Sequence, residues 1–122
     1  MSTKNFSSLG LDEGLLSVLR EEGYSEPSPI QLLAIEPILA GRDLLGLAQT
    51  GTGKTAAFAL PIIQNLLQSP DWVAPRGARV LILAPTRELA IQIDESFATY
   101  GRKSGLRRAC IFGGVGSSAQ ER

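Results

Sequence analysis

The sequence Ala48-Gln49-Thr50-Gly51-Thr52-Gly53-Lys54-Thr55 contains two closely spaced glycines and ends on a lysine and a threonine. Glycine tolerates backbone angles that let successive N–H groups point into one concavity, where they can hold anionic oxygens. In the phosphate-loop pattern, the lysine reaches the β and γ phosphates of a nucleoside triphosphate, and the threonine hydroxyl is a ligand of Mg²⁺. The stretch therefore predicts a triphosphate site in which Lys54 and Thr55 contact the reacting phosphates and the metal ion.

The residues on either side of this loop agree with that interpretation. Residues 43–47 predict a short buried strand and residues 56–60 the start of a helix, which is the strand, loop and helix order of a phosphate loop. Ala48 departs from the general pattern, which has glycine at that position. The competing interpretation is a plain glycine-rich turn before a helix.

Hydrophobic patterning predicts alternating helices and strands along the chain. Helices are expected over about residues 12–22, 29–41 and 87–100 and from residue 56 onward, and further strands at 79–84 and 108–112. Gly23 is the expected stop of the first helix, and Ser28 with Pro29 the expected start of the second. Pro37 and Pro61 fall inside helical patterns, so a kink or an interruption is expected at each.

The strand runs are continuously apolar, which is typical of a parallel sheet covered on both faces. The predicted fold class is α/β, a doubly wound parallel sheet, with three strands as an incomplete version of it. Residues 1–41 are predicted to form N-terminal helices, and residues 42–122 the N-terminal portion of a nucleotide-binding domain. The length of 122 residues fits one domain or part of one.

Composition excludes several classes of protein. No apolar run approaches the roughly 20 residues that span a bilayer, and the polar start is no signal peptide, so no membrane partner and a cytoplasmic location are expected. One cysteine and no histidine exclude a zinc site. Cys110 lies in an apolar run and is expected to be a small core residue.

The net charge of zero hides an uneven distribution. Up to residue 75 there are eight acidic and four basic residues, and from Arg76 onward four acidic and eight basic ones. The second half is thus the better candidate to face a polyanion. The alternative is that its basic cluster only solubilises a loop, and charge alone favours this alternative. The cluster consists of Arg102, Lys103, Arg107 and Arg108.

Gln31 has two competing interpretations. A glutamine amide can hydrogen-bond adenine N6 and N7 together, and it cannot satisfy guanine in the same pose. However, Ser28-x-x-Gln31 is also a capping box, in which the glutamine accepts a hydrogen bond from the Ser28 backbone N–H. The local sequence favours capping.

Two further segments predict contacts with phosphate groups. Pro85-Thr86-Arg87 follows a strand and opens a helix, so Thr86 as cap, the free N–H groups of the first turn and Arg87 make a site for one phosphate. The alternative is an ordinary helix start, in which Arg87 is a solvated charge or pairs with Glu88 or another carboxylate. Gly113-Gly114 after the last strand permits close backbone approach to a ligand, or is a flexible turn.

Together these residues resemble the front of the DEAD-box RNA helicases. Residues 23–31 are similar to the family's Q motif, residues 48–55 to its motif I, including the alanine, and residues 85–90 to its motif Ia. Phe6 lies 17 positions before Gly23, the spacing of the aromatic residue that stacks on adenine in that family. The resemblance implies a P-loop NTPase of the RecA-like fold that binds ATP with Mg²⁺. It also implies that Pro85, Thr86, Arg87, Gly113 and Gly114 contact the RNA sugar–phosphate backbone, independent of base sequence.

The resemblance also implies elements that the 122 residues lack: an Asp-Glu-Ala-Asp motif, a Ser-Ala-Thr motif and a C-terminal RecA-like domain. Hydrolysis needs charge stabilisation from several sides of the transferred phosphoryl group. The chain is therefore expected to be the N-terminal segment of an RNA-stimulated ATPase that unwinds or remodels RNA duplexes, and to be inactive by itself. The alternative is a passive module that binds an adenine nucleotide or RNA without turnover.

Overall fold

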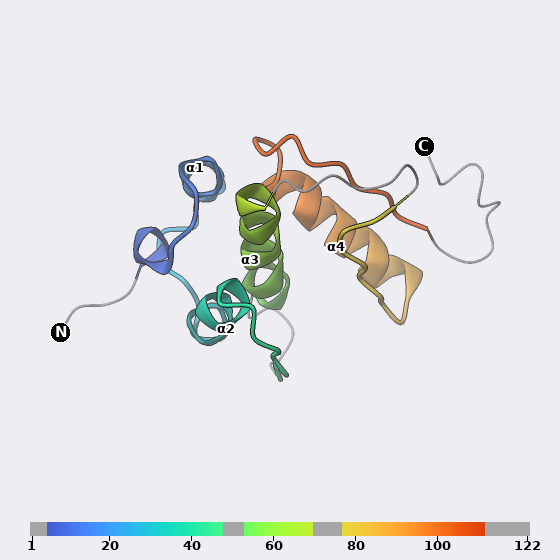
Figure 1. Cartoon of the computed structure of the whole chain (residues 1–122), viewed down its shortest axis with the longest axis horizontal. Helices are drawn as coiled ribbons and strands as arrows, with labels where there is room; N and C mark the ends of the chain where they lie inside the picture. Colours follow the sequence, from blue (N-terminus) through green and yellow to red (C-terminus); the bar gives the residue numbers. More distant parts are fainter. Residues whose placement is uncertain (1–4, 48–52, 70–76, 112–122) are drawn as a thin grey trace.

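The computed structural model describes residues 5–47, 53–69 and 77–111 of the chain. Within these ranges, one short 3-10 helix and four α-helices follow one another along the chain (Figure 1). They are η1 (Phe6–Leu9), α1 (Glu13–Glu21), α2 (Pro29–Leu39), α3 (Lys54–Gln68) and α4 (Arg87–Tyr100). Helix α3 packs against α2 and against α4, and α1 contacts α4. The helix that follows the predicted phosphate loop is therefore central to this arrangement.

Local signals set the bounds of α1. The Asp12 side chain accepts a hydrogen bond from the Gly14 N–H at 3.0 Å and caps the N-terminus. At the other end Gly23 has φ +82°, and the N–H groups of Gly23 and Tyr24 donate to the carbonyls of Arg20 and Leu19. This pair of bonds is a Schellman motif, which requires a left-handed residue after the cap. The predicted helix and its glycine stop are confirmed.

Helix α2 begins at Pro29 and ends at Leu39, where Gly41 at φ +80° makes the same kind of helix end. Pro37 lies inside α2 and Pro61 inside α3, and both helices continue through them. Neither proline interrupts its helix, and the kink, the other predicted outcome, stays a prediction. Pro61 is completely buried, so the packing of its ring offsets the lost backbone hydrogen bond.

The hydrophobic core joins the N-terminal segment to α3. It consists of Phe6, Leu9, Leu11, Leu15, Val18, Leu19, Ile35, Ala56, Ala59, Leu60, Ile63 and Tyr100, with Leu16, Leu39, Leu67 and Phe97 packed against it. These side chains come from all five helical elements. Burial of this apolar surface is the main force that holds the helices together.

The predicted parallel sheet is absent from the residues that the structure describes. Residues 43–47, 79–84 and 108–111 carry no strand assignment. Leu45, Leu47, Leu81 and Leu83 are each at least 79% exposed. An extended segment becomes a strand only when a neighbour accepts and donates its backbone hydrogen bonds, and no such neighbour pairs with these segments within the described ranges.

Candidate nucleotide-binding site

The start of α3 carries the described part of the predicted phosphate loop. Gly53 is the N-cap residue with φ +82° and ψ 27°, followed by Lys54 and Thr55 as the first two helical residues. Lys54 is exposed and Thr55 is half-buried. Gly53 has no side chain to cap this helix end, so the first N–H groups and the positive end of the helix dipole suit an anion. Residues 48–52, which were predicted to contact the nucleotide, lie outside the described residues.

Gln31 connects the starts of two helices. Its side chain is only 4% exposed. Its Oε1 accepts a hydrogen bond from the Ser28 backbone N–H at 2.9 Å, and its Nε2 donates to the Gly53 carbonyl at 3.3 Å. The first bond is the predicted cap of α2. The second, across 22 residues of sequence, was not predicted, because no local pattern signals it.

Gly53 has two reasons to be glycine. Its left-handed backbone disfavours any residue with a Cβ. A Cβ at this position would also lie 2.5 Å from the Gln31 Nε2 and 3.3 Å from the Ser28 Oγ. The glycine thus lets the loop exit approach the first turn of α2 closely.

The Ser28 hydroxyl oxygen is buried at the first turn of α2, where Ser28 and Gln31 form the capping box. This oxygen would lie 3.3 Å from a Cβ on Gly53, so the first turn of α2 adjoins the start of α3. Lys54 and the first N–H groups of α3 suit the phosphates of ATP, and the Thr55 hydroxyl oxygen suits Mg²⁺.

Phe6 lies on the core side of the N-terminal segment. Its ring is 5% exposed and belongs to the same apolar cluster as Ala56 and Leu60 of α3. The side chain is thus placed against the helix of the phosphate loop, and little of its surface is open to a base. Stacking on adenine stays a prediction.

The second predicted phosphate site lies at the start of α4. Thr86 caps this helix, with its Oγ1 accepting a hydrogen bond from the Leu89 N–H at 3.1 Å, as predicted. Pro85 and Arg87 are exposed. Gly113 and Gly114 lie outside the described residues.

The basic residues after α4 contact acidic side chains. Arg102 pairs with Glu21 at 2.5 Å and with Glu22 at 3.4 Å, and Lys103 pairs with Glu21 at 2.7 Å. The hydrogen bonds from Lys103 and Arg102 lower the pKa of Glu21 and keep it ionised. Arg108 likewise pairs with Asp94 at 2.9 Å. The cluster therefore ties α1 to the turn after α4, and three of its four members are engaged within the chain.

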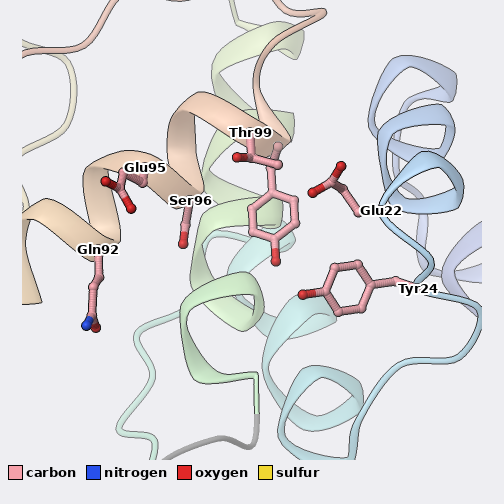
Figure 2. Close-up of a pocket in the computed structure, with 7 residues that line it drawn as sticks. Glu22, Tyr24, Gln92, Glu95, Ser96 and Thr99 are labelled. Atoms are coloured by element: carbon pink, nitrogen blue, oxygen red, sulfur yellow. The ribbon is translucent and has the colours of Figure 1, made fainter.

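A cleft of about 340 Å³ lies apart from the predicted nucleotide residues (Figure 2). Glu22 and Tyr24 face it from the end of α1, and polar side chains of α4 project from the opposite side. It is lined by Glu22, Tyr24, Gln92, Glu95, Ser96, Thr99 and Tyr100. Burial and, next, the Tyr24 hydroxyl raise the pKa of Tyr100, which keeps that phenol neutral. Because neither Gln31 nor Lys54 lines this cleft, it is distinct from the nucleotide site.

Sequence reasoning missed two amide contacts of α3. Gln64 is 4% exposed, and its Oε1 accepts from the Asp12 N–H at 2.6 Å. Asn65 donates from Nδ2 to the Ile38 carbonyl at 3.1 Å. The only signal in the sequence is a pair of adjacent amides directly after the apolar run of residues 56–63. The described residues contain no group of three or more side chains suited to a metal site and no helix able to cross a membrane.

A family model described as DEAD/DEAH box helicase matches residues 28–122. The chain is 49% identical over 117 residues to the ATP-dependent rRNA helicase RRP3 of Meyerozyma guilliermondii, covering 96% of this chain and 24% of that protein. It is 47% identical over 121 residues to RRP3 of Saccharomyces cerevisiae, covering 99% and 23%. The chain thus spans about a quarter of the length of the curated relatives it matches.

Solved structures show the same relationship. The RNA helicase Prp28 of Chaetomium thermophilum, bound to ADP, matches with a TM-score of 0.87 and 40% identity over 98% of this chain and 29% of that one. A DEAD box protein of Methanococcus jannaschii matches with a TM-score of 0.84 and 34% identity, over 95% and 31%. The class is therefore that of RecA-like helicase domains. Within it, the chain belongs to the DEAD/DEAH box helicase family and corresponds to the N-terminal region of a DEAD-box RNA helicase.

Proposed function

We propose that this chain binds ATP with Mg²⁺ as the N-terminal segment of an RNA helicase. The observation that carries the proposal is the hydrogen bond between Gln31 and Gly53, which attaches the candidate adenine-reading amide to the exit of the phosphate loop. The names of the relatives support it, since RRP3 is an ATP-dependent rRNA helicase and Prp28 was solved with ADP.

Gln31 has the hydrogen-bonding capacity for both of its predicted roles. A glutamine amide offers two lone pairs on oxygen and two N–H donors. The bonds to Ser28 and Gly53 use one of each. One acceptor and one donor remain, and these are the groups that adenine N6 and N7 require. Capping and adenine recognition are therefore compatible in the proposed site.

Different residues of the chain would contact different parts of the triphosphate. Lys54 would neutralise charge on the β and γ phosphates, and the first N–H groups of α3 would bind their oxygens. Mg²⁺, when bound, would neutralise charge on the triphosphate, and the Thr55 hydroxyl would hold it. The residues of this site approach the triphosphate from one side, so we propose that the 122-residue chain does not hydrolyse ATP by itself.

RNA is proposed as the second ligand, through its sugar–phosphate backbone. The support is the exposed start of α4, where Thr86 fixes the helix end beside Arg87. A phosphate contact of this kind positions the nucleic acid and carries no base information. Coupling of ATP turnover to RNA unwinding or remodelling belongs to this proposal, as does a cytoplasmic location.

Replacement of Lys54 tests the nucleotide site directly. Lys54→Ala removes the positive charge at the phosphates and should abolish detectable ATP binding in calorimetry of the complete protein. Lys103→Ala is the matched control, because it removes an exposed lysine that pairs with Glu21. Unchanged ATP affinity of Lys54→Ala would contradict the phosphate-loop assignment.

Gln31 can be changed so that its two roles separate. Gln31→Glu keeps an oxygen that caps α2, but it loses the N–H donors to adenine N7 and to the Gly53 carbonyl. We expect the preference for ATP over GTP to fall by about 1–3 kcal/mol, measured as a ratio of calorimetric affinities. Gln31→Ala should lose the same preference and also destabilise α2. A preference unchanged in both variants would leave capping as the only role.

A further inference from the structure

Gln64 is a buried amide in the middle of the apolar face of α3. Its neighbours on that face include Leu60 and Ile63, which are almost completely buried. A buried amide is unfavourable unless it is hydrogen-bonded. The bond of 2.6 Å from the Asp12 N–H to the Gln64 Oε1 meets this requirement. The polar residue is thus explained by its partner, 52 positions away in the sequence.

Asp12 is the residue at which the N-terminal segment turns into α1. Its side chain caps that helix, while its own backbone N–H lies before the helix and has no partner within it. The bond to Gln64 therefore fixes the position of the chain along α3 just after the segment Phe6–Leu11. Phe6, Leu9 and Leu11 are buried in the cluster that includes the first turns of α3.

One helix thus carries three features in order. Lys54 and Thr55 stand at its first turn, the side chains of the N-terminal segment pack along its next turns, and Gln64 fastens the end of that segment. We propose that Gln64 is a positioning residue of the nucleotide site, which sets where Phe6 lies relative to Lys54 and Thr55. This inference rests on the proposed ATP-binding function.

The test compares two ligands of the complete protein, ATP and inorganic tripolyphosphate, both with Mg²⁺. Tripolyphosphate needs only the phosphate loop, whereas ATP also needs a correctly placed base pocket. Gln64→Met keeps the volume and removes the acceptor, so ATP affinity should fall about threefold to tenfold while tripolyphosphate affinity stays constant. Gln64→Glu retains an oxygen acceptor for the Asp12 N–H and should restore most of the ATP affinity.

Asn65 provides a matched control on the same helix. Asn65→Leu removes the hydrogen bond from the side-chain amide to the Ile38 carbonyl of α2, and it leaves the bond between Asp12 and Gln64 in place. It should lower stability without changing the ratio of ATP to tripolyphosphate affinity. A double variant of Gln64→Met and Phe6→Leu should lose less than the sum of the two single losses, because both act on one contact.

The outcomes separate this inference from the proposed function. Equal losses for both ligands, no loss in Gln64→Met, or the same altered ratio in Asn65→Leu would each overturn the role of Gln64 while ATP binding stands. Failure of the unsubstituted protein to bind either ligand would overturn the proposed function and this inference together.

Discussion

Leucines in two regions of this chain differ in how far they are buried. Leu60 in α3 is completely buried, whereas Leu81 in the extended segment 79–84 is 79% exposed. Helix α3 forms its backbone hydrogen bonds within itself and can offer a finished apolar face to α2 and α4. The extended segment has no neighbour that pairs with it in the described ranges. An apolar segment can bury its side chains without cost only when its backbone groups are also hydrogen-bonded.

The largest expected effect comes from truncating one leucine in each region. Leu60→Ala should lower the free energy of unfolding of the chain by about 2–5 kcal/mol, because it leaves a cavity in the core. Leu81→Ala should change it by less than about 0.5 kcal/mol. Urea unfolding measures both. Comparable losses of unfolding free energy in the two variants would contradict the difference between the regions. A large loss for Leu81→Ala in the complete protein alone would identify a strand that is buried there.

A pair of glycines sharpens the contrast between a packed junction and an open helix end. Gly53 and Gly41 have φ of +82° and +80°, but only at Gly53 would a Cβ meet other atoms within 4 Å. Gly41→Ala should cost about 1–2 kcal/mol for the left-handed backbone alone. Gly53→Ala should cost about 1 kcal/mol more, since it displaces the Gln31 amide. Equal losses in thermal unfolding would show that the Gln31 contact contributes nothing.

The smallest expected effect lies at the surface, where Glu21 attaches α1 to the turn after α4. Its pKa is lowered below 4.5 in the folded chain, so its contribution to stability is complete above pH 4.5 and is lost as the pH falls through the lowered value. The difference in urea midpoint between the chain and Glu21→Gln should be small, and it should vanish in acid. Glu13→Gln, which removes a pair inside α1, is the control. A difference that persists in acid would contradict the role of the ionised pair.

The features that the sequence predicts well are those whose causes are local. Asp12, Gly23, Ser28 and Thr86 mark helix ends through bonds to residues at most five positions away, and these ends agree with the structure. The same holds for Gln31 as the cap of α2.

What sequence reasoning missed depends on partners far along the chain. The contacts of Gln31 with Gly53 and of Gln64 with Asp12 span 22 and 52 positions, and no periodic pattern encodes them. The burial of Phe6 belongs to a helix of four residues, too short for a hydrophobic period to appear. The pairing of strands is likewise a long-range property, which an apolar run alone does not determine.

The two bonds of the Gln31 amide also fix which way round this planar group is held. Rotation by 180° would set its oxygen against the Gly53 carbonyl and its NH₂ group against the Ser28 N–H, so like partners would oppose each other at both ends. The side chain therefore resists flipping to suit another purine. In the proposed site, the Gln31 amide already has the orientation that favours adenine before any nucleotide binds. Base discrimination therefore requires no rearrangement of this side chain.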